Sequence, residues 1–188
     1  MAIIGVMGSG QVEWPALSGP LGRWLAENGF DLLTGAGRGV MLATARAFSS
    51  NQGRKGRSIG VVPSEAHPVH GFVPSPGYPN PYIDLPIVTP LPRKLAAAPD
   101  EALNRNYVNV LTSDVVVALP GSRGTLDEIC LATRFAKPLI CIGPADAFAG
   151  VPEGTRIVAE LAQVYAFVLA AAASSAKAEG AAPKLGQG

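Results

Sequence analysis

The sequence predicts an α/β fold with a mostly parallel central sheet between two layers of helices. Short apolar runs rich in β-branched residues alternate with longer segments of helical spacing along most of the 188 residues. Three of these runs pass directly into a glycine-rich loop. Strands that alternate with helices form right-handed crossover units, which place the strands parallel and cover both faces of the sheet. A composition of 48% hydrophobic and 15% charged residues fits such a buried sheet.

The first half of the chain contains three expected strands and two expected helices. The strands are expected at 3–7, 30–34 and 57–62, and the helices at about 15–28 and at 40–48. Pro15 suits the first turn of its helix, although Pro20 offers an alternative start. Gly29 suits the position just after the helix end.

The segment 63–92 differs from its surroundings because it holds nine prolines and little periodicity. Only 83–88 has the character of a strand. A long loop inside a compact domain is usually functional or mobile. We therefore expect a loop with one short strand.

The second half returns to the alternation of helices and strands. Helices are expected at 100–113, 125–136 and 154–173, and strands at 114–119 and 138–142. The chain length fits a single domain over 1–173. Residues 174–188 are mostly small or polar, so we expect a disordered tail there.

The helix expected at 100–113 has two distinct faces. Helical spacing predicts an apolar core stripe made of Leu103, Tyr107, Val110 and Leu111. A separate polar stripe consists of Arg105, Asn109 and Thr112. Spacing alone leaves open where Arg105 lies relative to the loop at 120–128.

Glycine-rich loops follow the expected strands after Met7, Thr34 and Leu119. In a parallel sheet these loops share the carboxyl edge, where free backbone N–H groups and helix dipoles favour anions. Glu128 lies about one helical turn beyond the third loop, and because a carboxylate repels phosphate we expect it to face another part of the ligand. We therefore expect one shared site for a phosphorylated small molecule. The residues expected to bind its phosphate or nucleotide are Gly8, Ser9, Gly35, Gly37, Gly39, Met41, Pro120, Gly121, Ser122, Arg123, Gly124 and Thr125.

Simpler roles remain open for the same residues. The glycines could serve only to make tight strand–helix turns, because one glycine loop alone is a weak motif. Glu128 could only complement the dipole at the start of its helix.

Residues 120–128, PGSRGTLDE, resemble the PGGxGTxxE signature of the Lonely Guy (LOG) phosphoribohydrolases, long labelled lysine decarboxylase-like, with Ser122 at the second glycine. Arg105 lies 15 residues before Pro120, which is the spacing of the catalytic arginine in that family. The 35–41 loop and Gly8-Ser9 are similar to the other glycine loops of the family. The resemblance covers roughly residues 2–143. It implies a Rossmann-like three-layer sandwich, a dimer with sites at the subunit interface, and Glu128 and Arg105 as catalytic residues.

Two departures resemble a sister branch of Rossmann-like nucleotide-binding proteins. Asn106 stands where LOG enzymes have a lysine, and the 35–41 loop is one residue shorter than theirs. That branch includes molybdenum cofactor carrier proteins, which bind a phosphorylated pterin.

The resemblance leaves two functions open. One is hydrolysis of the N-glycosidic bond of a nucleoside 5′-monophosphate, in which Glu128 stabilises an oxocarbenium-like sugar and activates water. Arg105 would then fix the phosphate or ribose. The other is a non-catalytic carrier for a phosphorylated ligand such as molybdenum cofactor, with its molybdopterin, or a nucleotide.

Neither function requires a metal or redox cofactor. His67 and His70 lack a third ligand nearby, so no metal site is expected. No lysine lies in a glycine-loop context, which argues against a pyridoxal-dependent decarboxylase.

Charge and terminal patterns exclude other classes of partner. The net charge of +1 provides no field for nucleic acid or a membrane surface. The N-terminus has no charged region of a signal peptide, and the apolar run 164–173 is too short to span a membrane. Two isolated cysteines provide no disulfide framework. We therefore expect a cytoplasmic homodimer or higher homo-oligomer whose partner is a small phosphorylated ligand.

Overall fold

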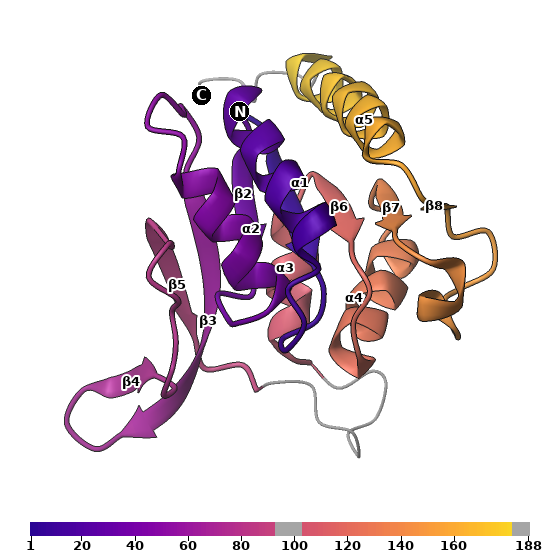
Figure 1. Ribbon diagram of the computed structural model, residues 1–188. Helices are drawn as coiled ribbons and strands as arrows, with labels where there is room; N and C mark the ends of the chain where they lie inside the picture. Colours follow the sequence, from indigo (N-terminus) through magenta and orange to yellow (C-terminus); the bar gives the residue numbers. More distant parts are fainter. Residues whose placement is uncertain (93–102, 182–188) are drawn as a thin grey trace, which may run out of the picture.

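A computed structural model describes residues 1–92 and 103–181 of the chain (Figure 1). Over these residues it confirms an α/β, Rossmann-like fold whose central sheet is mostly parallel. The strands follow the order β4-β3-β2-β1-β6-β7-β8, and β5 pairs with β3 outside this path. The strands are β1 (Ile3–Met7), β2 (Asp31–Thr34), β3 (Ser58–His67), β4 (Gly71–Pro74), β5 (Leu85–Thr89), β6 (Val115–Ala118), β7 (Leu139–Ile142) and β8 (Ile157–Val158). The helices are α1 (Pro15–Glu27), α2 (Val40–Ser49), α3 (Arg105–Thr112), α4 (Arg123–Arg134) and α5 (Leu161–Ala181), with a 3₁₀ turn η1 (Ala145–Phe148).

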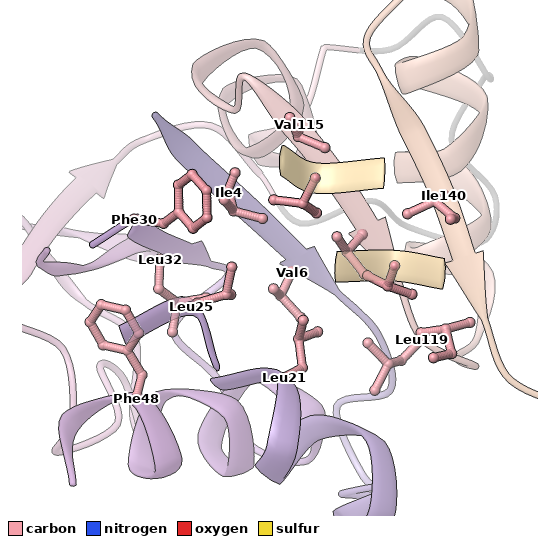
Figure 2. Close-up of a cluster of buried hydrophobic side chains, with 14 of the residues drawn as sticks. Ile4, Val6, Leu21, Leu25, Phe30, Leu32, Phe48, Val115, Leu119 and Ile140 are labelled. Atoms are coloured by element: carbon pink, nitrogen blue, oxygen red, sulfur yellow. The ribbon is translucent and has the colours of Figure 1, made fainter. Parts of the chain in front are cut away.

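Alternate residues of the central strands face opposite layers of helices. Ile4 and Val6 of β1 pack in one cluster with residues of α1, α2 and α5 (Figure 2). Met7, at the end of the same strand, packs on the other face with Val110 of α3 and Leu131 of α4. Because successive side chains of a strand point to opposite faces, one short apolar strand supports both layers.

The order of strands reverses between β1 and β6, which lie side by side at the centre of the sheet. From β1 the chain builds outward to β2 and β3, and from β6 it builds outward to β7 and β8. In open α/β sheets a ligand binds outside the carboxyl ends of the strands at such a reversal. All three glycine loops lie at this edge.

The proline-rich segment holds more regular structure than expected. β3 continues to His67 and pairs antiparallel with β4, and this hairpin projects away from the helices (Figure 1). The short strand expected at 83–88 is present as β5, which pairs parallel with β3. β4 was missed because prolines and polar residues interrupt its apolar pattern, and β8 because it is only two residues long.

The first helix begins where it was predicted, whereas the last helix needs correction at both ends. α1 begins at Pro15 and continues through Pro20, so the alternative start at Pro20 was wrong. The last helix begins at Leu161 rather than at 154, because β8 occupies part of the earlier segment. The disordered tail expected at 174–188 was wrong for 174–181, where α5 continues with several alanines, the strongest helix formers. Residues 182–188 lie outside the described residues.

The helix expected at 100–113 is shorter and rotated from its predicted orientation. It begins at Arg105, where the Asn104 side chain caps it by accepting from the Asn106 N–H (2.8 Å); the expected start at 100–102 lies outside the described residues. Leu103 and Leu111 of the predicted core stripe are 57% and 45% exposed. Arg105 and Asn109 of the polar stripe are buried instead. Val110 of the predicted core stripe is fully buried as expected, but Arg105 and Asn109 share the inward side because they find polar partners there, the carbonyls of two loops for Arg105 and Glu128 of α4 for Asn109.

Candidate functional site

A cleft of about 430 Å³ opens at the carboxyl edge of the sheet, above the ends of β1, β2 and β6. It is formed by all three glycine loops together with the starts of α3 and α4. The predicted site residues that line it are Gly8, Ser9, Gly35, Met41, Arg105, Ser122, Gly124, Thr125 and Glu128. The shared site inferred from three separate loops is therefore one cavity.

Four other predicted residues lie behind the lining and shape it. Gly39 has a φ of 60°, and a Cβ there would collide with the backbone of Ser9. A Cβ on Gly121 would collide with Thr125 Oγ1, and one on Gly37 would come within 2.9 Å of Met41. The carbonyl of Pro120 accepts from the Ser9 N–H (3.2 Å). These positions determine the shape of the loops, so glycine is required by the protein itself at several of them.

Ser9 connects the three loops through its backbone. Its N–H donates to Pro120 in the third loop, and its carbonyl accepts from the Val40 N–H at the start of α2 (2.9 Å). Its hydroxyl accepts from the N–H groups of Gln11 (3.1 Å) and Val12 (2.9 Å). The side chain predicted to bind phosphate thus stabilises its own turn.

The start of α4 presents unpartnered backbone donors. No acceptor is present for the N–H groups of residues 121–125 within the part of the chain that the structure describes. Ser122, the N-cap residue, makes no capping hydrogen bond with its side chain. A Cβ on Gly124 would meet nothing within 4 Å, so the space beside it is open. A helix N-terminus with free donors and an open approach is suited to a phosphate.

Arg105 is buried in the wall of the cleft, with 8% of its surface exposed. Its Nη1 donates to the carbonyls of Gly35 (2.8 Å) and Val61 (2.9 Å). Its guanidinium lies 5.7 Å from the centre of the Tyr78 ring, within range of a cation–π contact. Arg105 therefore connects α3 to the second glycine loop and to β3 while it carries positive charge into the cleft.

Glu128 is also buried, with 8% of its surface exposed. Burial raises the pKa of its carboxyl from 4.5 to about 7, although the hydrogen bond from Asn109 and the charge of Arg105 act in the opposite direction. The Nδ2 of Asn109 donates to Glu128 Oε1 (2.7 Å), and Asn109 Oδ1 is buried without a partner among the described residues. Rotation of that amide would let a protonated Glu128 donate to Oδ1, so the pair accommodates both protonation states. A carboxyl group that is half neutral near pH 7 repels a phosphate less than a fixed charge does.

Asn106 occupies the position of the lysine in LOG enzymes and has a structural partner. Its Nδ2 donates to Asp127 Oδ2 (2.8 Å), and the Nδ2 of Asn104 approaches the same oxygen (3.4 Å). These contacts join the start of α3 to α4. Asn106 thus lines the cleft with an uncharged side chain.

The buried state of Glu128 predicts that its removal stabilises the protein at alkaline pH. Between pH 4.5 and about 7 the folded state binds a proton that the unfolded state has released, so stability falls as pH rises through this interval. Above this pH interval the buried charge of Glu128 lowers the free energy of unfolding by its full amount, at most about 3 kcal/mol. We expect Glu128→Gln to exceed the wild type in free energy of unfolding at pH 8, and to match it near pH 4.5.

Urea titrations at both pH values measure this difference. Glu153→Gln, at an exposed carboxylate, provides the matched control and should change stability little at either pH. An equal effect of Glu128→Gln at pH 4.5 and pH 8 would contradict the assignment.

Several residues of the cleft were not predicted. Arg38 and Tyr78 are the most important, because they supply an exposed cation and an aromatic wall. Arg38 lies inside the second glycine loop, so its position in that motif could have identified it. Tyr78 comes from the proline-rich segment, and no local pattern connects it with Arg105. The remaining unpredicted lining residues are Val6, Met7, Gly10, Gln11, Pro76, Gly77 and Asn106.

The side chain of one predicted binding residue lies outside the main cleft. Arg123 is exposed and lines a neighbouring pocket on the other side of the α4 start. Its backbone N–H nevertheless belongs to the unpartnered donors at residues 121–125.

The described residues contain no cluster of three or more histidine, cysteine or acidic side chains that could hold a metal ion. His67 instead serves the β3–β4 turn, where its Nδ1 accepts from the N–H groups of Val69 and His70 (both 3.2 Å). Over the same part of the chain, no helix has the length and apolar character needed to cross a bilayer.

The fold and the glycine-loop cleft together define a Rossmann-like protein of the LOG-like superfamily. The chain belongs to the SLOG cluster4 family, whose pattern it matches over residues 1–176. The resemblance inferred from the PGSRGTLDE motif and the short 35–41 loop is therefore confirmed.

Solved structures with the same fold include two proteins that handle molybdenum cofactor. The molybdenum cofactor carrier protein of Chlamydomonas reinhardtii is 30% identical, with a TM-score of 0.68 over 92% of this chain and 98% of that chain. The molybdenum cofactor binding protein of Rippkaea orientalis is 27% identical, with a TM-score of 0.64 over 90% of this chain and 96% of that chain. An uncharacterized protein of Archaeoglobus fulgidus is 26% identical over 150 residues, which are 79% of this chain and 84% of that protein.

Proposed function

We propose that this protein binds a phosphorylated small molecule in the cleft and acts as a carrier for a phosphorylated pterin such as molybdenum cofactor. The observation that carries the proposal is the set of unpartnered N–H groups at residues 121–125, which open onto a cleft with two arginines. The similarity to the two molybdenum cofactor proteins supports the choice of ligand.

The charges of the cleft favour an anion over a cation. Among the residues that the structure describes, Arg38 and Arg105 are the cationic lining residues of the cleft, and Glu128 is the acidic one. Because the pKa of Glu128 is about 7, its charge is partly neutralised at neutral pH. The net field at the start of α4 is therefore positive and adds to the helix dipole.

The positions of the two predicted catalytic residues favour binding over turnover. The Nη1 of Arg105 is engaged by two backbone carbonyls, and Asn106 provides no charge beside it. A hydrolase relies on fixed positive groups that stabilise the charge developing in the transition state, so an uncharged residue at position 106 removes one such group, whereas a carrier needs only the anion site. Gly35 cannot be replaced without displacing Arg105, since a Cβ there would lie 2.9 Å from Nη1.

A second function is favoured by one observation, the pKa of about 7 at Glu128. A carboxyl that titrates near the working pH is suited to general acid–base chemistry. In a nucleoside 5′-monophosphate phosphoribohydrolase, Glu128 would stabilise the oxocarbenium-like sugar and activate water. Neither function calls for a metal or redox cofactor.

Native mass spectrometry of freshly purified protein separates the two functions. We expect a retained molybdopterin or intact nucleotide. Bound ribose 5-phosphate or free base would instead support hydrolysis. Incubation with a panel of nucleoside monophosphates should then release no free base, and release that is lost in Glu128→Gln would overturn the carrier assignment in favour of the enzyme.

We further propose that the protein is a cytoplasmic homodimer, as the LOG-like resemblance implies. Leu111 at the end of α3 and Phe135 after α4 are large exposed apolar residues on the same layer of helices. Exposed apolar surface on a small domain is typical of an interface.

A further inference from the structure

A second, smaller pocket of about 190 Å³ lies on the other side of the α4 start, against η1. Ser122 and Thr125 line both this side pocket and the main cleft. Gly121 and Arg123 also line the side pocket, next to these two residues. The rest of its wall is apolar and consists of Leu126, Ile129, Ala147, Phe148, Ala149 and Val151.

The two cavities lie on either side of the start of α4, next to the reversal of strand order. The main cleft is built by the loops that follow β1, β2 and β6 and spans the reversal, whereas the side pocket is built by the loops that follow β6 and β7. In a doubly wound sheet a ligand with two halves lies at this edge, with its phosphates at the first turn of a helix. Here the first turn of α4 lies between two cavities, one at the reversal and one a strand further along the sheet.

The boundary between the cavities is suited to phosphate. The unpartnered N–H groups of residues 121–125 lie there. Thr125 is only 4% exposed and faces both cavities, yet its hydroxyl has no hydrogen-bond partner among the described residues. The oxygen is not among the fully buried polar atoms that lack a partner, so it is accessible from the cavities and can hydrogen-bond to a phosphate oxygen there. Arg123, which has no role in the main cleft, adds a cation at the rim of the side pocket.

We propose that the ligand consists of two ring systems joined by a diphosphate, with one ring in each cavity and the diphosphate at the start of α4. This inference rests on the proposed phosphate-binding function and specifies the class of its ligand. The side pocket lies below the roughly 300 Å³ at which pockets begin to enclose a whole drug-sized molecule. It therefore takes one ring of a larger ligand, and its apolar wall suits a flat aromatic ring.

Titration calorimetry with dinucleotides and their own halves tests the proposal. The probes are NAD⁺ against AMP and nicotinamide mononucleotide, and FAD against AMP and FMN. We expect at least one dinucleotide to bind tenfold or more tightly than the tighter-binding of its two mononucleotides. The second ring adds contacts without a second loss of translational and rotational entropy.

Filling the side pocket should remove this advantage selectively. We expect Ala147→Trp to reduce dinucleotide affinity to that of the mononucleotide, and to leave mononucleotide affinity within twofold of the wild type. Ala145→Trp, in the same turn but outside the pocket lining, is the matched control and should change neither. Ala149 directly follows the turn and also lines the side pocket. Ala149→Trp therefore provides a second pocket-filling variant if Ala147→Trp unfolds.

The outcomes separate this inference from the function on which it rests. Binding of mononucleotides with no tighter binding of either dinucleotide overturns the two-ring ligand alone. A dinucleotide advantage that survives both tryptophan variants also overturns it, because the second ring would then lie elsewhere. Absence of binding by every probe and by inorganic phosphate overturns the proposed function as well.

Discussion

Replacement of Gly124 by valine is expected to abolish ligand binding, with a loss of at least 100-fold, and to leave the fold intact. The backbone of Gly124 lies in the first turn of α4, where the N–H donors are free. A Cβ at this position meets nothing within 4 Å, and the residue is outside the left-handed region, so the protein accommodates the side chain. The valine methyl groups would instead occupy the space beside the N–H groups that a phosphate needs. A 100-fold loss corresponds to about 3 kcal/mol of binding free energy.

Titration calorimetry with AMP and with the ligand found by mass spectrometry measures the effect, and thermal unfolding checks the fold. Gly53→Val is the matched control, because Gly53 lies in the loop between α2 and β3, outside the cleft, and is likewise free of steric clashes. Normal binding by Gly124→Val would show that the phosphate lies elsewhere. Loss of binding in Glu128→Gln together with normal binding in Gly124→Val would reverse the roles assigned to these two residues.

The second large effect is expected from the two arginines of the cleft, which differ in burial. Arg105→Ala should lower both stability and ligand affinity, whereas Arg38→Ala should lower affinity alone. Removal of Arg105 leaves the carbonyls of Gly35 and Val61 without this donor. Each buried carbonyl that stays unsatisfied lowers the free energy of unfolding by about 1–3 kcal/mol. The substitution also removes a charge that holds the pKa of Glu128 down, so that pKa should rise further. Arg38 is exposed and makes no hydrogen bond or ion pair among the described residues.

Urea unfolding and calorimetry of the two variants measure these effects. Arg105→Lys is a useful intermediate, because it keeps the charge but lacks the planar fork of donors that reaches two carbonyls. We expect it to recover part of the binding and little of the stability. A stable Arg105→Ala variant, or a destabilised Arg38→Ala variant, would contradict the structural role given to Arg105.

Much of the fold could be predicted because its signals are local. The apolar runs at β1, β2, β6 and β7 and the glycines that follow three strands are short-range patterns, and each lies where expected within one or two residues. The hairpin of β3 and β4 could not be predicted in the same way. Its pairing joins residues across a turn in a proline-rich segment, where the alternation of apolar and polar residues is interrupted.

The candidate site likewise combines features set by local sequence patterns with features set by tertiary contacts. The sequence by itself determined the class of fold and the edge of the sheet at which the glycine-loop cleft lies, and it led to the proposal of a phosphorylated ligand, because a glycine loop between a strand and a helix has the same donors in any such fold. Only the tertiary structure decided that Arg105 faces inward to Gly35 and Val61 and that Tyr78 closes over it. It alone also decided that burial brings the pKa of Glu128 to about 7. These properties depend on contacts and desolvation among residues far apart in the chain, which no local pattern of residues records.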